Sequence, residues 1–217
     1  MLNTLRHCRE NSVPELLETA PGLSDKVDAS GQLLPFPGNT VVFLLDEQVK
    51  RQLSMLQEEL YSRCGDFLAQ RLHPDTFHMT LHDLANGSCL SQKEEMAHGA
   101  KEILDRIRGA KIPPIPMKAA CSFNMVNTSI VLLLEPADDD AWQQLDDLYM
   151  QFQQVRTLPY ALTPHITLAY FRPGCYPESQ THRLRCALTS VELDVMLEPR
   201  ALVLQDFDHM NAYKTIY

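Results

Sequence analysis

The chain has 217 residues, 45% of them hydrophobic, and a formal net charge of −9. This length and apolar content suffice for one sizeable domain or two small lobes with a buried core. The negative charge disfavours binding to a long duplex nucleic acid, whereas a nucleotide or a single RNA terminus remains compatible because a pocket can be locally positive.

The sequence predicts a cytoplasmic protein that does not bind a membrane. Residues 1–10 lack the apolar run and small-residue cleavage site of a secretory signal. Apolar stretches such as Val41–Leu45 are far shorter than the roughly 20 residues that a membrane-spanning helix needs. The cysteines have no paired spacing, so we expect reduced thiols at Cys8, Cys64, Cys89, Cys121, Cys175 and Cys186.

Two regions are expected, an N-terminal extension over residues 1–38 and a main domain over residues 39–217. Proline and glycine residues interrupt any long helix or strand in the extension, so we expect it to wrap around the main domain, with a short helix at Leu16 and Leu17.

The main domain begins with a predicted strand, helix and strand. Residues 40–45 are β-branched and apolar, which is typical of a buried strand. Asp46 is a suitable N-cap for a helix that ends before Gly65. Residues 77–84 form the next predicted strand.

The second half repeats this order. A helix over about residues 91–108 and strands over 115–125 and 129–134 precede a helix that starts near Asp138. This last helix is expected to turn Trp142, Leu145, Tyr149 and Phe152 toward the core. Closing strands are predicted at 191–195, 201–204 and 213–217, which gives an α+β fold with mostly antiparallel pairing.

One four-residue pattern occurs twice. His78-Met79-Thr80-Leu81 and His165-Ile166-Thr167-Leu168 both read histidine, apolar residue, threonine, leucine. The interval from the preceding apolar strand is 33 positions for Leu45 to His78 and 31 for Leu134 to His165. Comparable frames around the same pattern indicate an internal duplication.

The pattern predicts acid and base groups on one side of each strand. Side chains at i and i+2 share a face, so His78 and Thr80 project together while Met79 and Leu81 face the core. Two imidazoles can serve as general base and general acid, with a bell-shaped rate profile near neutral pH. The threonine hydroxyls can donate to phosphate oxygens, and no metal or other cofactor is required.

On these residues the chain resembles the two-histidine phosphoesterases of the RNA ligase/cyclic phosphodiesterase superfamily. The resemblance rests on the first motif and on Pro164-His165-Ile166-Thr167-Leu168, and it covers about residues 39–217. It implies two pseudo-symmetric lobes, each an antiparallel sheet with flanking helices, around a central cleft that carries both H-x-T motifs. It also implies metal-independent hydrolysis of a 2′,3′-cyclic phosphate or a 2′,5′-phosphodiester. The implied catalytic residues are His78 and His165, with Thr80 and Thr167 as phosphate ligands.

Four further residues are candidates for substrate binding: His82, Tyr170, Phe171 and Arg172. Many relatives have a basic residue three positions after the second motif threonine, where this chain has Tyr170. Tyr170 can hydrogen-bond a phosphate or stack on a base, although strict strand alternation turns it toward the core. His82 shares the cleft-facing parity of His78 and is therefore a candidate to line the pocket, but the sequence favours a structural or supporting role for it.

Other interpretations remain open for nearby side chains. Asp83, Asp206 and Asp208 are candidates to orient an imidazole, or are solvated loop residues. His78 and His82 are four positions apart, a spacing that suits zinc on a helix. The strand pattern and the missing glutamate of H-E-x-x-H argue against this, so we predict no metal site.

The leading hypothesis is a monomeric phosphodiesterase that acts on a nucleotide or RNA-terminus substrate. The first alternative is a non-catalytic protein that binds a nucleotide or phosphate ligand in the same cleft, with the extension covering the groove. The second is an interaction module in which the extension contacts a partner protein.

Overall fold

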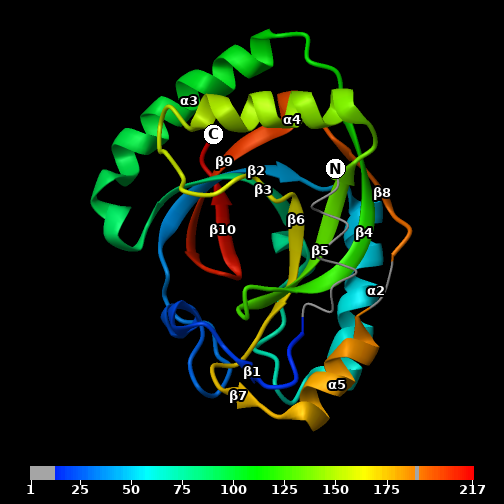
Figure 1. The fold of residues 1–217 in the computed structure, drawn as a ribbon. Coiled ribbons are helices and arrows are strands. Elements are labelled where there is room, and N and C mark those ends of the chain that lie inside the picture. The colour runs from blue at the N-terminus through cyan, green and yellow to red at the C-terminus, as the bar shows by residue number, and fades with distance from the viewer. Residues whose placement is uncertain (1–12, 189–190) are drawn as a thin grey trace.

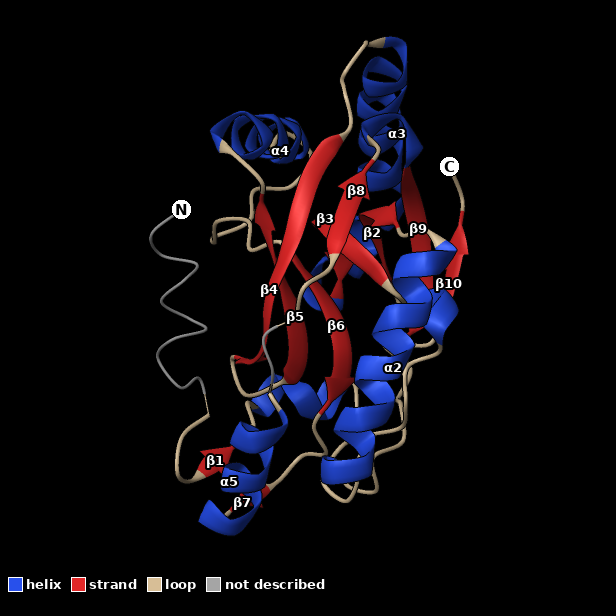
Figure 2. Ribbon diagram, turned by 90° about the vertical axis from the view of Figure 1, so that its right-hand side faces the viewer, coloured by secondary structure: helices blue, strands red, loops and turns tan. Residues whose placement is uncertain are grey.

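The computed structural model describes residues 13–188 and 191–217, and it shows helices around a strongly curled sheet (Figures 1 and 2). The strands are β1 (Leu17–Glu18), β2 (Gly38–Leu44), β3 (His78–Asn86), β4 (Ile115–Met125), β5 (Ser129–Pro136), β6 (His165–Tyr170), β7 (Cys175–Tyr176), β8 (Asp194–Leu197), β9 (Leu202–His209) and β10 (Ala212–Thr215). The α-helices in these residues are α2 (Glu47–Cys64), α3 (Lys93–Gly109), α4 (Asp139–Phe152) and α5 (Glu178–Ala187).

Eight strands form one antiparallel sheet in the order β10-β9-β2-β3-β6-β5-β4-β8, and β1 pairs with β7 in a separate sheet. The order is symmetric about its centre, where β2 and β3 of one half correspond to β5 and β6 of the other. The halves join between β3 and β6, where Met79 lies opposite Ile166. The predicted α+β fold with two pseudo-symmetric lobes is confirmed, and both lobes contribute to one sheet.

The helices cross between the two halves. Figure 1 shows α3 and α4 side by side at one end of the molecule and α2 with α5 at the other. Helix α2 contacts β6, while α4 contacts β3. The helix that precedes each motif therefore packs on the motif strand of the other half, which ties the two lobes together.

Capping and apolar spacing explain where these helices begin and which side they bury. The carboxylate of Asp46 accepts a hydrogen bond from the Val49 N–H at 2.8 Å, and Asp138 caps α4 in the same way. Leu145 is fully buried as predicted. Trp142 is 38% exposed, so the prediction that it faces the core is wrong. Ala141 takes the inward position in that turn instead.

The described part of the N-terminal segment contributes to the core. Leu17, Leu23 and Val27 are each at most 1% exposed and belong to the same apolar cluster as the sheet residues Val41 and Met79. Leu17 begins strand β1 rather than the expected short helix, because its backbone pairs with Tyr176. The boundary at residue 38 stays a prediction.

No helix in the described residues is long and apolar enough to cross a membrane.

The expectation of reduced thiols holds for Cys64, Cys89, Cys175 and Cys186, which are free. It is wrong for Cys121, which takes part in a disulfide. Spacing along the chain does not reveal which cysteines the fold brings together. Cys8 lies outside the described residues.

Candidate active site

The two motifs lie on neighbouring strands at the centre of the sheet. Met79 and Ile166 are opposite one another and fully buried, so the residues on either side of them project from the other face. The antiparallel register places His78 at the level of Thr167 and Thr80 at the level of His165. All four side chains line one cavity of about 570 Å³.

Each motif histidine is held by a backbone carbonyl two positions earlier in the chain. The His78 Nδ1 lies 2.7 Å from the carbonyl oxygen of Thr76, and the His165 Nδ1 lies 2.6 Å from that of Thr163. A carbonyl oxygen only accepts, so the proton of each neutral ring belongs on Nδ1 and the lone pair on Nε2. Both rings therefore present the same tautomer, ready to take or give a proton at Nε2.

A β-bulge follows each motif at the same position. In β3, Val42 pairs with Thr80 and Val41 with His82, which leaves Leu81 without a partner in the ladder. In β6 the ladder skips Leu168 in the same way, since Thr167 and Ala169 pair with consecutive residues of β5. A bulge reverses the alternation of side chains beyond it.

The bulge in β3 turns His82 away from the cleft. His82 is 1% exposed and lies between the rings of Tyr149 and Phe152, with ring centroids 5.2 and 6.1 Å away. The expectation that His82 shares the parity of His78 is wrong, because simple alternation does not count the extra residue. Asp83 takes the cleft-facing position and lines the cavity.

The bulge in β6 turns one of the predicted substrate-binding residues into the cavity. Tyr170 lines the cavity, although strict alternation directed it toward the core. Phe171 is fully buried and Arg172 donates from Nε to the Leu68 carbonyl oxygen at 2.8 Å, and neither lines the cavity. Of the four candidate substrate-binding residues, the structure brings only Tyr170 to the motifs.

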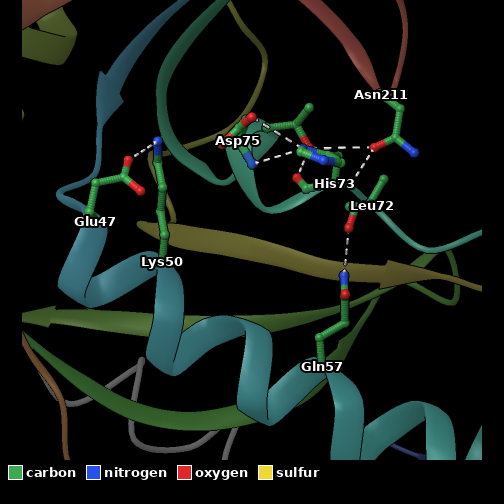
Figure 3. Close-up of polar contacts among 8 residues, drawn as sticks. Glu47, Lys50, Gln57, Leu72, His73, Asp75 and Asn211 are labelled. Atoms are coloured by element: carbon green, nitrogen blue, oxygen red, sulfur yellow. Dashed lines mark hydrogen bonds and ion pairs between the residues drawn. The ribbon is translucent and has the colours of Figure 1, made fainter.

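Helix α2 supports both the second bulge and the loop before β3. The buried Gln57 donates from Nε2 to the carbonyl oxygen of Leu168 at 2.9 Å and to that of Leu72 at 3.1 Å. Figure 3 shows Gln57 reaching Leu72, and Asn211 accepting from the backbone N–H of His73 at 2.7 Å. These contacts fix the segment that carries Thr76, whose carbonyl holds His78.

The cavity is lined by polar groups near the histidines and by aromatic rings around them. Its described lining contains one ammonium group, Lys26, and one carboxylate, Asp83. Asp206 forms an ion pair with Lys93 at 2.9 Å, and neither Asp206 nor Asp208 lines the cavity. The aromatic members are Phe36, Tyr149, Tyr160, Tyr170, Phe207 and Tyr213.

Burial favours the neutral form of both motif histidines. The pKa of His78 falls from 6.5 to about 4. Desolvation is the main cause and a charge on His165 adds to it, while the Thr76 carbonyl and Asp83 oppose the shift. Desolvation also lowers the pKa of His165, against the Thr163 carbonyl and Asp83. The repulsion between two charged rings is mutual, so a proton on either histidine disfavours a second proton on the other.

Several site residues were not predicted from the sequence. Thr76 and Thr163 had a usable signal, because a threonine stands two positions before both histidines. Tyr213, whose ring centroid is 4.9 Å from that of His78, and Lys26 had none, because they lie far from the motifs in sequence.

No cluster of three or more histidine, cysteine, aspartate or glutamate side chains that could hold a metal ion occurs in residues 13–188 and 191–217. Metal-free chemistry stays a prediction.

Comparison with known proteins shows similarity in structure rather than in sequence. No family matches the sequence and no curated protein is similar to it. A conserved protein of unknown function from Agrobacterium tumefaciens, ATU0111, has 16% identity over 92% of both chains and a TM-score of 0.67. TT0787 of Thermus thermophilus has 15% identity over 83% of this chain and 95% of its own, with a TM-score of 0.60.

E. coli LigT, solved with 3′-AMP, has 13% identity over 84% of this chain and 96% of its own, with a TM-score of 0.54. The chain therefore shares its fold with E. coli LigT.

Proposed function

We propose that the protein is a metal-independent phosphodiesterase that opens a 2′,3′-cyclic phosphate or cleaves a 2′,5′-phosphodiester at a nucleotide or RNA end. The observation that carries this is the pair of motif histidines, held in the same tautomer on adjacent strands within one cavity. The LigT fold, in a protein solved with 3′-AMP, supports a nucleotide ligand. A cavity of about 570 Å³ is within the usual size range of small-molecule sites.

In this mechanism one motif histidine is the base and the other the acid; the symmetry of the site allows either assignment, and His78 is taken as the base. The neutral Nε2 of His78 takes a proton from water as the water oxygen bonds to phosphorus. The bond from phosphorus to a ribose oxygen breaks, and the protonated His165 gives its Nε2 proton to that oxygen. The product is a phosphate monoester, and proton exchange with solvent restores both rings.

The threonines and the bound phosphate complete the assignment. Thr80 and Thr167 donate hydroxyl hydrogen bonds to the non-bridging oxygens and stabilise the charge that develops there. An anionic phosphate beside His165 favours its protonated form, which offsets the lowering of its pKa by burial.

The alternative is capture of a nucleotide without turnover. The observation in its favour is the burial of His78 and His165, which lowers the pKa of both and so disfavours the protonated acid that turnover needs. Nucleotide binding in calorimetry, with no product over hours, would support it.

The test is an assay in EDTA with a panel of 2′,3′-cyclic nucleotides, 2′,5′-linked oligonucleotides and ADP-ribose cyclic phosphate. The wild type should turn over at least one of them, and His78→Ala and His165→Ala should each lower kcat by about 10²- to 10⁴-fold with an unchanged circular dichroism spectrum. The matched control is His98→Ala, since the His98 side chain is 79% exposed on α3. Wild-type activity that is lost on chelation contradicts the metal-free mechanism.

A further inference from the structure

The described lining of the cavity carries one positively charged and one negatively charged side chain. Its single described ammonium group, Lys26, and its single described carboxylate, Asp83, belong to different ends of the site. The motifs are symmetric, so this charge difference is what distinguishes the two ends for a ligand.

Lys26 is placed on the faces of aromatic rings. Its Nζ lies 4.8 Å from the ring centroid of Phe36 and 5.9 Å from that of Tyr170, and both rings line the cavity. No carboxylate within the described ranges forms an ion pair with Lys26, so its charge is available to a ligand.

The backbone around Lys26 is anchored. Its carbonyl oxygen accepts from the Leu34 N–H at 2.8 Å, and the next residue, Val27, is fully buried. The ammonium is thus carried on a fixed segment rather than on a free loop, which lowers the entropic cost of using it to bind.

A chain of contacts assigns Lys26 to the His78 end. Tyr170, beneath Lys26, donates its hydroxyl to the Met210 Sδ at 3.2 Å, and the Tyr213 hydroxyl reaches the same sulfur at 3.7 Å. The edge of Tyr213 in turn contacts His78, with 4.9 Å between ring centroids.

Asp83 belongs to the His165 end. Its carboxylate accepts from the hydroxyl of Tyr160 at 3.3 Å, and Tyr160 lies on the segment that leads through Thr163 to His165. The antiparallel register of β3 and β6 also places Asp83 beyond Thr80, toward His165. An anion is repelled at this end and attracted at the other.

We propose that Lys26 is a specificity-determining residue, which binds the phosphate of the ligand at the His78 end and makes the cleft prefer a phosphorylated nucleoside to the same nucleoside without phosphate. The inference rests on the proposed nucleotide ligand but not on turnover. The N-terminal segment thereby completes a site whose motifs are all in the remainder of the chain.

The test is calorimetry of the full chain with 3′-AMP and with adenosine. Lys26→Gln should weaken 3′-AMP binding by about ten- to a hundredfold, as expected when a charged hydrogen bond is lost, and leave adenosine binding unchanged. Lys26→Arg should retain most of the affinity. Lys111→Gln, an exposed position with the same change of charge, is the matched control and should bind like the wild type.

Equal binding of 3′-AMP by Lys26→Gln and Lys111→Gln overturns the inference, and so does a wild type that does not bind 3′-AMP. Equal weakening of adenosine and 3′-AMP also overturns it, because the loss would then be one of packing. Phosphodiesterase activity is measured separately. If Lys26→Gln loses 3′-AMP binding and the wild type shows no turnover, the proposed phosphodiesterase activity is contradicted. The role of Lys26 in binding phosphate is then still supported.

Discussion

At the scale of single residues, the chemistry depends on which nitrogen of each imidazole faces the cleft. The carbonyl oxygens of Thr76 and Thr163 hold the Nδ1 atoms of His78 and His165 at 2.7 and 2.6 Å. Neither ring uses a carboxylate for this purpose, so each stays less basic than an imidazole paired with an aspartate. A bound phosphate supplies the negative charge that an aspartate would otherwise provide, so one of the two rings can hold a proton beside it.

The buried His82 should make stability depend on pH. Its pKa falls from 6.5 to about 4, chiefly by desolvation, so between these values the unfolded chain binds a proton that the folded chain does not. Stability is therefore lost as the pH falls through this window. In His82→Leu the loss at pH 4 should be smaller by about 3 kcal/mol, measured by urea unfolding at several pH values.

The control for this prediction is the exposed histidine of α3, His98. His98→Leu should keep the wild-type slope of unfolding free energy against pH. A His82→Leu variant with that same slope would show that His82 protonates freely in the folded protein.

The sequence was sufficient to predict the four motif residues and the face that they share, because alternation is reliable over three residues of a strand. It did not predict which neighbours line the cavity, because the bulges at Leu81 and Leu168 reverse the alternation immediately afterwards. Asp83 and Tyr170, equivalent in the two halves, both enter the site for this reason.

At the scale of elements, the site depends on helices that cross between the halves. Gln57 of α2 binds the carbonyl of Leu168 in the second motif strand, and α4 packs its Tyr149 against His82 behind the first. A change in either helix should therefore act on the motif of the opposite half.

The hairpin between β4 and β5 carries strain at the cavity. Val126 has a φ of 44° and is 73% exposed, and a β-branched residue is disfavoured in this left-handed region. Val126→Asn should raise the free energy of unfolding by about 1 kcal/mol, because asparagine tolerates a positive φ. Urea unfolding measures the difference.

Val126→Thr is the matched control, since threonine is also β-branched and is more polar than valine. It should show no gain in stability. Equal stabilisation by asparagine and threonine would mean that removing an exposed apolar side chain, rather than relieving the backbone, is responsible.

Most elements were predicted close to their observed bounds, since capping residues and apolar spacing determine them locally. Helix α5 was not predicted, because only Thr181, Leu184 and Ala187 of its 10 residues are buried and the apolar pattern is correspondingly weak. Trp142 was placed inward by helical spacing, yet its position in the first turn of α4 leaves it half-covered at the surface.

At the scale of the whole molecule, the fold joins an N-terminal segment, two duplicated halves and closing strands around one cavity. The pairing of the halves could be predicted from the repeated motif, and the wrapping of the N-terminal segment from its prolines and glycines, but the contribution of that segment to the core could not. Pro21 and Gly22 stand between its buried residues Leu17 and Leu23 and interrupt any regular pattern.

This integration predicts that residues 39–217 are unstable alone. Removing residues 1–38 takes several buried apolar side chains out of the core, and the burial of each contributes about 1.5–3 kcal/mol to stability. The total free energy of unfolding of a domain is only about 5–15 kcal/mol. The shortened chain should show a much lower Tm in thermal unfolding, or no cooperative transition.

Two single substitutions test whether the stability depends on the packing of the N-terminal segment rather than on the length of the chain. Leu17→Ala, at a side chain 1% exposed, should cost about 2–5 kcal/mol, whereas Leu16→Ala, at one 63% exposed, should change stability by less than about 0.5 kcal/mol. Full stability of the 39–217 chain would show that the extension is dispensable for folding.

The pH dependence of turnover tests the paired acid and base most directly. One motif histidine must be neutral and the other protonated, so kcat/KM should be bell-shaped. Because burial lowers the pKa of both His78 and His165, its maximum should lie on the acidic side of neutrality. The maximum of kcat should lie at higher pH, because the bound phosphate favours the protonated imidazole. Profiles of kcat and kcat/KM that are both flat from about pH 5 to pH 9 would contradict the two-histidine mechanism.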